Sequence, residues 1–211
     1  MRLIILGAPG AGKGTQACIL SGRLGLIHIS TGDILRDEIK NGTPVGLYVK
    51  PLIESGSLVP DDMIIKILKN RIAKPDCARG FILDGFPRTV PQAMALGEVC
   101  EIDAVVEIFV SDDIIAERIS GRKVCPSCGA TYHIKYNIPE RENICDVCGT
   151  ELAVRRDDSS LVIKERLTVY HDQTDPLTAY YEKRGKLLRV DGQTSVAETT
   201  RLMCEALGID D

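Results

Sequence analysis

Residues 3–15 read LIILGAPGAGKGT, an apolar run that leads into a glycine-rich turn containing one lysine. The run is typical of a buried parallel strand, and residues 16–24 are compatible with a helix. Glycines let backbone N–H groups converge on one point, where the helix dipole adds partial positive charge. Lys13 contributes a full charge, and the Thr15 hydroxyl suits Mg²⁺. The stretch predicts a phosphate-binding loop formed by Gly10, Ala11, Gly12, Lys13, Gly14 and Thr15.

The loop departs in one position from the strict P-loop pattern. That pattern has Ser or Thr directly after the lysine, whereas Gly14 here separates Lys13 from Thr15. A glycine-rich turn without a ligand is the alternative interpretation. The strand before the turn, the helix after it and the placement of the lysine favour the phosphate site.

Length and composition describe a soluble globular protein. The chain has 211 residues, enough for one domain with an insertion. Hydrophobic residues make up 44% and charged residues 27%, and the net charge of −4 argues against broad nucleic-acid binding. No apolar run approaches transmembrane length, and Met1 and Arg2 lead directly into the first strand. We therefore expect a cytoplasmic protein without a signal peptide or membrane anchor.

Strand and helix patterns alternate along the chain. Strands are expected at residues 3–6, 26–29, 81–84, 104–110 and 187–190. A turn at residues 30–33 should lead into a helix at 34–40, Asp61 should cap a later helix, and Thr89 and Ser195 should cap two others. Five short strands separated by helices predict an α/β fold with a doubly wound parallel sheet and helices on both faces. Ligands of such sheets bind beyond the carboxyl ends of the strands.

Several motifs, in this order, are similar to those of the adenylate kinases, a family of nucleoside monophosphate kinases. They are GAPGAGKGT at residues 7–15, STGDILR at 30–36, LDGFPRT at 83–89, Gly121-Arg122, RRDD at 155–158, and Arg166. The resemblance extends over nearly the whole chain, and the displaced threonine is normal for that family.

The resemblance implies three moving parts and a reaction. Residues 1–29, 60–120 and 159–211 would form the core, 30–59 the AMP-binding domain, and 121–158 a lid that closes over ATP. The reaction would be reversible phosphoryl transfer, ATP + AMP ⇌ 2 ADP, with Mg²⁺ and by a monomer. Such transfer requires in-line positioning, exclusion of water and positive charge around the phosphate oxygens.

The same resemblance implies the site residues. The catalytic set is Lys13, Asp84, Arg88, Arg122, Arg155 and Arg166, with Asp84 as a holder of Mg²⁺ through water and Asp33 as a second candidate for that role. The AMP contacts are Thr31, Arg36, Ser57, Leu58, Val59, Gly85, Phe86, Pro87, Arg88, Gln92, Arg155 and Arg166. The ATP contacts beyond the loop are Arg118, Arg122, Thr131, Tyr132, Gln193 and Thr194. The histidines at 28, 133 and 171 are interpreted as structural.

Four cysteines form a separate pattern. Two Cys-x-x-Cys-Gly knuckles, at residues 125–129 and 145–149, have sixteen residues between their nearest cysteines. Four thiolates at that spacing predict a closed tetrahedral zinc site formed by Cys125, Cys128, Cys145 and Cys148, although iron also suits such a ligand set. Two disulfides are the poorer interpretation for a cytosolic enzyme.

Two other functions compete with AMP phosphorylation. A related enzyme on the same fold would phosphorylate UMP, CMP or GMP, although Gln92 and the inserted lid favour AMP. A zinc-ribbon module that binds nucleic acid would explain the cysteines but not Lys13 or Asp84, and the acidic net charge opposes it.

Overall fold

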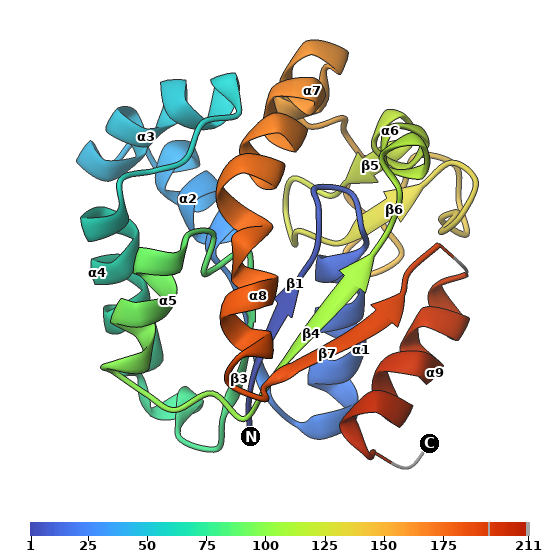
Figure 1. The fold of residues 1–211 in the computed structure, drawn as a ribbon. Coiled ribbons are helices and arrows are strands. Elements are labelled where there is room, and N and C mark those ends of the chain that lie inside the picture. Colours follow the sequence, from blue (N-terminus) through green and yellow to red (C-terminus); the bar gives the residue numbers. More distant parts are fainter. Residues whose placement is uncertain (194, 210–211) are drawn as a thin grey trace.

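The computed structural model describes residues 1–193 and 195–209. A parallel sheet forms the centre of the fold. The strands are β1 (Arg2–Leu6), β2 (Ile27–Ser30), β3 (Phe81–Asp84), β4 (Ala104–Phe109) and β7 (Leu187–Asp191). Their order is β2-β3-β1-β4-β7, and all neighbours are parallel (Figure 1). The predicted five-stranded sheet is confirmed, with β1 at its centre.

Helices cover both faces of this sheet. They are α1 (Lys13–Leu24), α2 (Thr31–Lys40), α3 (Pro44–Ser55), α4 (Asp61–Ile72), α5 (Val90–Gly97), α6 (Asp112–Ser120), α7 (Ser160–Val169), α8 (Pro176–Glu182) and α9 (Val196–Leu207). Side chains alternate along β1, so Ile4 and Leu6 enter a core with α2–α5 and α8. Leu3 and Ile5 enter a second core, with α1, α6 and α9. This alternation is the reason that one short apolar run organises both layers.

Short helical turns complete the chain between these elements. They are the 3₁₀ turns at Pro75–Cys77 and Arg156–Asp158 and a π-helical turn at Tyr170–Thr174. The π-helical turn joins α7 to α8, and the three run as one long helical segment across the front of Figure 1. Among the described residues, no helix has the length and apolar character needed to cross a bilayer.

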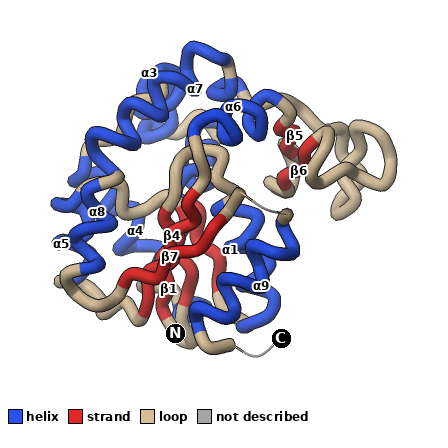
Figure 2. The backbone as a smooth tube through the Cα atoms, turned by 45° about the vertical axis from the view of Figure 1, so that its right-hand side comes forward, coloured by secondary structure: helices blue, strands red, loops and turns tan. Residues whose placement is uncertain are grey.

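A second, smaller sheet lies in the inserted segment and was not predicted from the sequence. Strands β5 (Arg122–Val124) and β6 (Thr131–His133) pair antiparallel within it. Figure 2 shows that this segment protrudes beyond α6, away from the central sheet. Both strands have only three residues, which is too short for an alternating pattern to stand out.

Two local predictions were wrong about where a helix begins. Helix α2 begins at Thr31 rather than after a turn at 30–33, because Ser30 is the N-cap and its hydroxyl accepts from the Asp33 N–H at 3.2 Å. Asp61 is not a cap: the N-cap of α4 is Pro60, and Asp61 is the first helical residue. The predicted caps at Thr89 and Ser195 are confirmed.

Candidate active site and metal centre

The glycine-rich loop follows β1 and ends at the first residue of α1. Gly10 and Gly12 have φ of +87° and +95°, a backbone region that disfavours side chains. Lys13 turns back into the loop, where its Nζ donates to the carbonyl oxygens of Gly7 at 2.7 Å and Ala8 at 2.8 Å. The loop therefore holds an ammonium group at the centre of a ring of backbone groups.

The charge on Lys13 is sensitive to what occupies the loop. Burial lowers its pKa to about 7, although the Asp84 carboxylate favours the charged form. Neighbouring cations, Arg88 foremost, act in the same direction as burial. A bound phosphate chain would supply the missing negative charge, so the environment of Lys13 favours an anionic ligand.

Asp84 ends β3 beside this lysine. Its Oδ2 lies so near the loop that a Cβ added at Gly14 would be 3.2 Å away. Burial opposes its ionisation, but His28 and Lys13 outweigh burial and hold the pKa of Asp84 below its usual range. An ionised carboxylate at a phosphate loop is the oxygen ligand that Mg²⁺ prefers, so the donor chemistry fits the predicted ion.

His28 is a neighbour of Asp84 that the sequence did not reveal. Its Nε2 is buried and lies 3.4 Å from Asp84 Oδ2, without a well-aligned hydrogen bond. The two residues stand on adjacent parallel strands, where Ser30 is opposite Asp84. Only the register of β2 against β3 brings them together, so a lone histidine in the sequence gave no signal.

Five of the six predicted arginines, all except Arg118, come from separate elements and lie within electrostatic reach of others in the group. They are Arg36 in α2, Arg88 after β3, Arg122 in β5, Arg155 before the turn at 156–158, and Arg166 in α7. Burial lowers the pKa of Arg88 to about 10, and Arg166 adds to that effect. Burial also lowers the pKa of Arg155 to about 10, with contributions from Arg36 and Arg122. Burial is the larger cause in both cases, and the added effects of Arg36, Arg122 and Arg166 show that these arginines lie near one another.

Carboxylates neutralise only part of the cluster. Arg36 pairs with Asp33 and Arg122 with Asp158. Arg166 contacts Asp157 at 3.0 Å and Asp158 at 3.3 Å.

Two of the arginines have no such partner. Among residues 1–193 and 195–209, no carboxylate lies within 4 Å of the guanidinium groups of Arg88 and Arg155. The Arg88 Nε donates instead to the Gly85 carbonyl at 2.9 Å. Two unpaired, desolvated guanidinium groups make an anion site.

Two cavities meet at this cluster. The first is lined by nine predicted AMP residues: Thr31, Arg36, Ser57, Leu58, Val59, Gly85, Arg88, Gln92 and Arg166. The second is lined by Gly7, Lys13, Pro87 and Tyr170, and it shares Gly85, Arg88 and Arg166 with the first. Phe86 is 1% exposed in the core, so its side chain does not face either cavity. The phosphate loop thus opens onto a second chamber through Arg88 and Arg166.

Gln92 holds the backbone of Arg88, the arginine that lines both cavities. Its amide oxygen accepts from the Arg88 backbone N–H at 2.7 Å, and its amide nitrogen donates to Asp61 at 2.6 Å. Across the loop, the Thr31 hydroxyl donates to the Gly85 carbonyl at 2.9 Å. Both side chains are buried, so they fix the backbone from which Arg88 projects.

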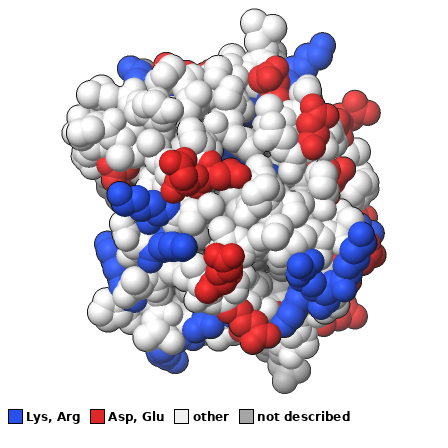
Figure 3. Space-filling model, turned by 60° about the vertical axis from the view of Figure 1, so that its left-hand side comes forward, with Lys and Arg blue, Asp and Glu red and all other residues white. Residues whose placement is uncertain are grey.

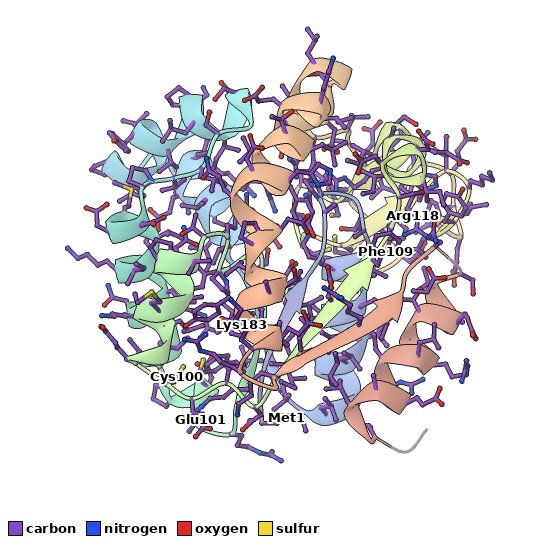
Figure 4. All side chains as sticks on the ribbon, viewed as in Figure 1. Met1, Cys100, Glu101, Phe109, Arg118 and Lys183 are labelled. Carbon is purple, nitrogen blue, oxygen red and sulfur yellow. The ribbon has the colours of Figure 1, made fainter. Side chains whose placement is uncertain are left out.

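The predicted ATP contacts gather less tightly. Arg118 donates to the Gly192 carbonyl at 2.6 Å, and the Gly192 N–H donates in turn to the carbonyl of Phe109 at the end of β4 (Figure 4). The Gln193 N–H donates to Asp191 at 2.9 Å, while Thr194 lies outside the described residues. Thr131 is in β6; the neighbouring Tyr132 directs its side chain inward, toward the cysteines.

The four predicted metal ligands come together in the inserted segment. The sulfur atoms of Cys125, Cys128, Cys145 and Cys148 all lie within 4.8 Å of one another. Two Sγ–Sγ distances are 3.4 and 3.5 Å, close to the edge of about 3.8 Å that a tetrahedron with Zn–S bonds of about 2.3 Å requires. Four thiolates at this spacing fit a closed tetrahedral metal site, as predicted.

The nucleic-acid alternative would require a basic patch on the surface. On the face shown in Figure 3, acidic and basic side chains are interspersed without a continuous basic patch. Of the clustered cations, Lys13, Arg36, Arg88 and Arg166 line the two cavities.

The site has a glycine-rich loop and a lysine directly after the central strand, next to a second cavity that arginines line. This arrangement defines the class of P-loop phosphotransferases. The adenylate kinase family profile matches residues 5–186. Adenylate kinase of Caldicellulosiruptor saccharolyticus is 53% identical over 215 aligned residues that cover both chains fully. Those of Acetivibrio thermocellus and Methanocella arvoryzae are 53% and 48% identical and cover 98% and 95% of each chain. This chain belongs to the adenylate kinase family.

Proposed function

We propose that the chain catalyses reversible phosphoryl transfer between ATP and AMP, giving two ADP. The observation that carries this function is the meeting of two cavities at Arg88 and Arg166. One cavity is lined by Gly7, Pro9 and Lys13 of the glycine-rich stretch, and the other by residues of α2, α3 and the loop after β3. Two nucleotides bound in these cavities would bring their phosphates to the same pair of arginines.

The chain divides into parts that suit this reaction. Residues 1–29, 60–120 and 159–211 form the core, 30–59 the AMP-binding domain, and 121–158 the lid. The first cavity supports the AMP domain, because residues of α2 and the 56–59 turn line it. Arg122 and Arg155, near the two ends of the lid, support its closure over ATP, since each belongs to the cationic cluster.

The residue roles that we propose are those implied by the family resemblance, and the position of several of these side chains around the two cavities supports them. The backbone of residues 10–15 and Lys13 hold the ATP phosphate chain, and Arg36 and Arg88 hold the AMP phosphate. An AMP phosphate oxygen attacks the γ-phosphorus in line, and the bond from that phosphorus to the β-phosphate oxygen breaks. Arg122, Arg155 and Arg166 stabilise the charge on the transferred group, and the cluster is held in place before the reaction. Fixed cations of this kind need little reorganisation when the charge moves.

Two metal ions complete the proposal. Mg²⁺, held through water by Asp84, would neutralise charge on the phosphate oxygens. Zn²⁺ would occupy the four thiolates, where four protein ligands leave no open position and the role is structural. We further propose a cytoplasmic monomer, in agreement with the interspersed surface charges (Figure 3).

A coupled assay that offers each nucleoside monophosphate with MgATP tests the function. We expect AMP to be phosphorylated with the highest kcat/KM. A higher kcat/KM with UMP, CMP or GMP would replace the proposed substrate, and no turnover with any of them would refute phosphoryl transfer between nucleotides.

A further inference from the structure

The position of Tyr132 at the metal site points to a role that the predicted ATP contact does not describe. It is the middle residue of β6, it is 6% exposed, and it belongs to a small core with Cys125, Cys145 and Leu152. Its hydroxyl oxygen lies 3.5 Å from Cys145 Sγ. The same oxygen accepts a hydrogen bond from the Asp146 backbone N–H at 2.9 Å.

The chemistry of the hydroxyl fixes the direction of the sulfur contact. A phenol has one hydrogen to donate and lone pairs to accept with. The Asp146 N–H uses a lone pair, so the hydrogen remains available for Cys145. A metal-bound cysteine is a thiolate and can only accept. The contact in the loaded site is therefore O–H donating to sulfur.

The other sulfur atoms have different partners. Cys125 Sγ receives the Cys128 backbone N–H at 3.5 Å, within its own knuckle. Cys148 Sγ lies 3.3 Å from the Thr150 hydroxyl, only two residues away. Tyr132 alone among these partners comes from a different element of the lid. It links the second knuckle to the β5–β6 pair, where Lys123 is opposite Tyr132 and β5 begins with Arg122.

We propose that Tyr132 is a positioning residue of the lid metal site, whose hydroxyl orients the Cys145 thiolate and joins the second knuckle to β6. Partners of this kind orient metal ligands, and their loss typically weakens metal affinity about 10- to 100-fold. The consequence for the enzyme is mechanical: the metal rigidifies the strand pair that carries Arg122. The inference rests on the proposed metal site and is independent of which monophosphate is the substrate.

Tyr132→Phe tests the proposal, with Tyr136→Phe as the matched control in the same lid. The Tyr136 hydroxyl donates to the exposed carboxylate of Glu117 at 2.8 Å and touches no thiolate. In zinc-loaded full-length protein, transfer of metal to a chromogenic chelator should be faster for Tyr132→Phe, and its zinc affinity at equilibrium should be about 10- to 100-fold weaker. The control should release zinc at the wild-type rate.

A spectroscopic readout separates the hydrogen bond from simple packing. In Co²⁺-substituted protein, loss of a hydrogen bond to sulfur raises the energy of its lone pairs. The thiolate-to-cobalt charge-transfer band should therefore move to lower energy in Tyr132→Phe and stay in place in the control. If Tyr132→Phe releases zinc faster but its charge-transfer band does not move, the hydrogen-bond role is overturned. Zinc release by Tyr132→Phe at the wild-type rate would overturn it as well.

A measurement on the unaltered chain keeps the test valid if Tyr132→Phe does not fold. In the cadmium-loaded protein, NMR should show the Tyr132 hydroxyl proton exchanging with water much more slowly than that of Tyr136. Equal exchange rates would overturn the proposal. Failure of the wild-type chain to bind any metal would refute the metal site as well, while the coupled nucleotide assay would be unaffected by that result.

Discussion

Arg88→Lys is the substitution that most directly probes the junction of the two cavities. Arg88 presents a planar guanidinium whose Nε is held by the Gly85 carbonyl at 2.9 Å, and the residue lines both cavities. Lysine keeps the positive charge but replaces the fork with a point charge. The substitution therefore isolates geometry from charge.

The magnitude follows from the hydrogen bonds at stake. A hydrogen bond to a charged group contributes about 1.5–3 kcal/mol, and about 1.4 kcal/mol is tenfold in affinity. Loss of one prong of a bidentate contact predicts a rise of about 10- to 150-fold in the KM for AMP. The KM for ATP should change little, because the phosphate loop and Lys13 are untouched.

The assay is steady-state turnover with AMP varied at saturating MgATP, then the reverse. Arg71→Lys is the control, because Arg71 makes a comparable two-pronged contact with Asp76, at 3.0 and 2.9 Å, and lines neither cavity. An effect confined to the KM for ATP would mean that the two nucleotide pockets are assigned in reverse. Unchanged constants would remove Arg88 from the site.

The remaining predictions concern charge and metal. Lys13→Met should lower kcat by about 10²-fold or more while circular dichroism shows the fold intact, and near-normal turnover would remove the phosphate-loop assignment. Nucleotide binding at pH 8 should take up close to one proton, because the pKa of Lys13 is about 7 without phosphate and must rise beside a bound phosphate. Calorimetry in buffers of different ionisation enthalpy measures this uptake, and no uptake would contradict the prediction. Cys145→Ser, or chelation, should lower the melting temperature of the lid substantially, since the free energy of zinc binding in small ribbons is about 10–16 kcal/mol. Activity should fall much less in assays well below that melting temperature. Normal melting with lost catalysis would make the metal catalytic.

The sheet and the phosphate loop were predictable because their signals are local. The alternating side chains of β1 divide between two cores, and the loop is contiguous with that strand. The four cysteines were equally predictable, since the two-residue spacing within each knuckle determines which thiolates can share an ion. In each case the interacting residues are neighbours in the chain or repeat at a fixed interval.

Features that depend on strand register or side-chain direction were not predictable from one sequence. His28 reaches Asp84 only because β2 lies beside β3 in a particular register. The family resemblance makes Tyr132 a predicted nucleotide contact, but it does not reveal that the side chain turns toward Cys145. Gln92 likewise looks like a ligand contact, and its amide also braces the backbone of Arg88.

Arg88→Met tests whether the buried positive charge of Arg88 lowers the stability of the folded protein. No carboxylate in the described part of the chain pairs with Arg88, and its pKa of about 10 reflects burial and repulsion from Arg166. Such a shift corresponds to at most a few kcal/mol against the charged form in the folded protein. Arg88→Met should therefore raise the melting temperature of the nucleotide-free protein, by about 2–4 °C per kcal/mol, while AMP binding is lost. Differential scanning calorimetry with and without AMP measures both effects. A fall in melting temperature would show that Arg88 stabilises the fold. Phosphate binding would then not be its only role.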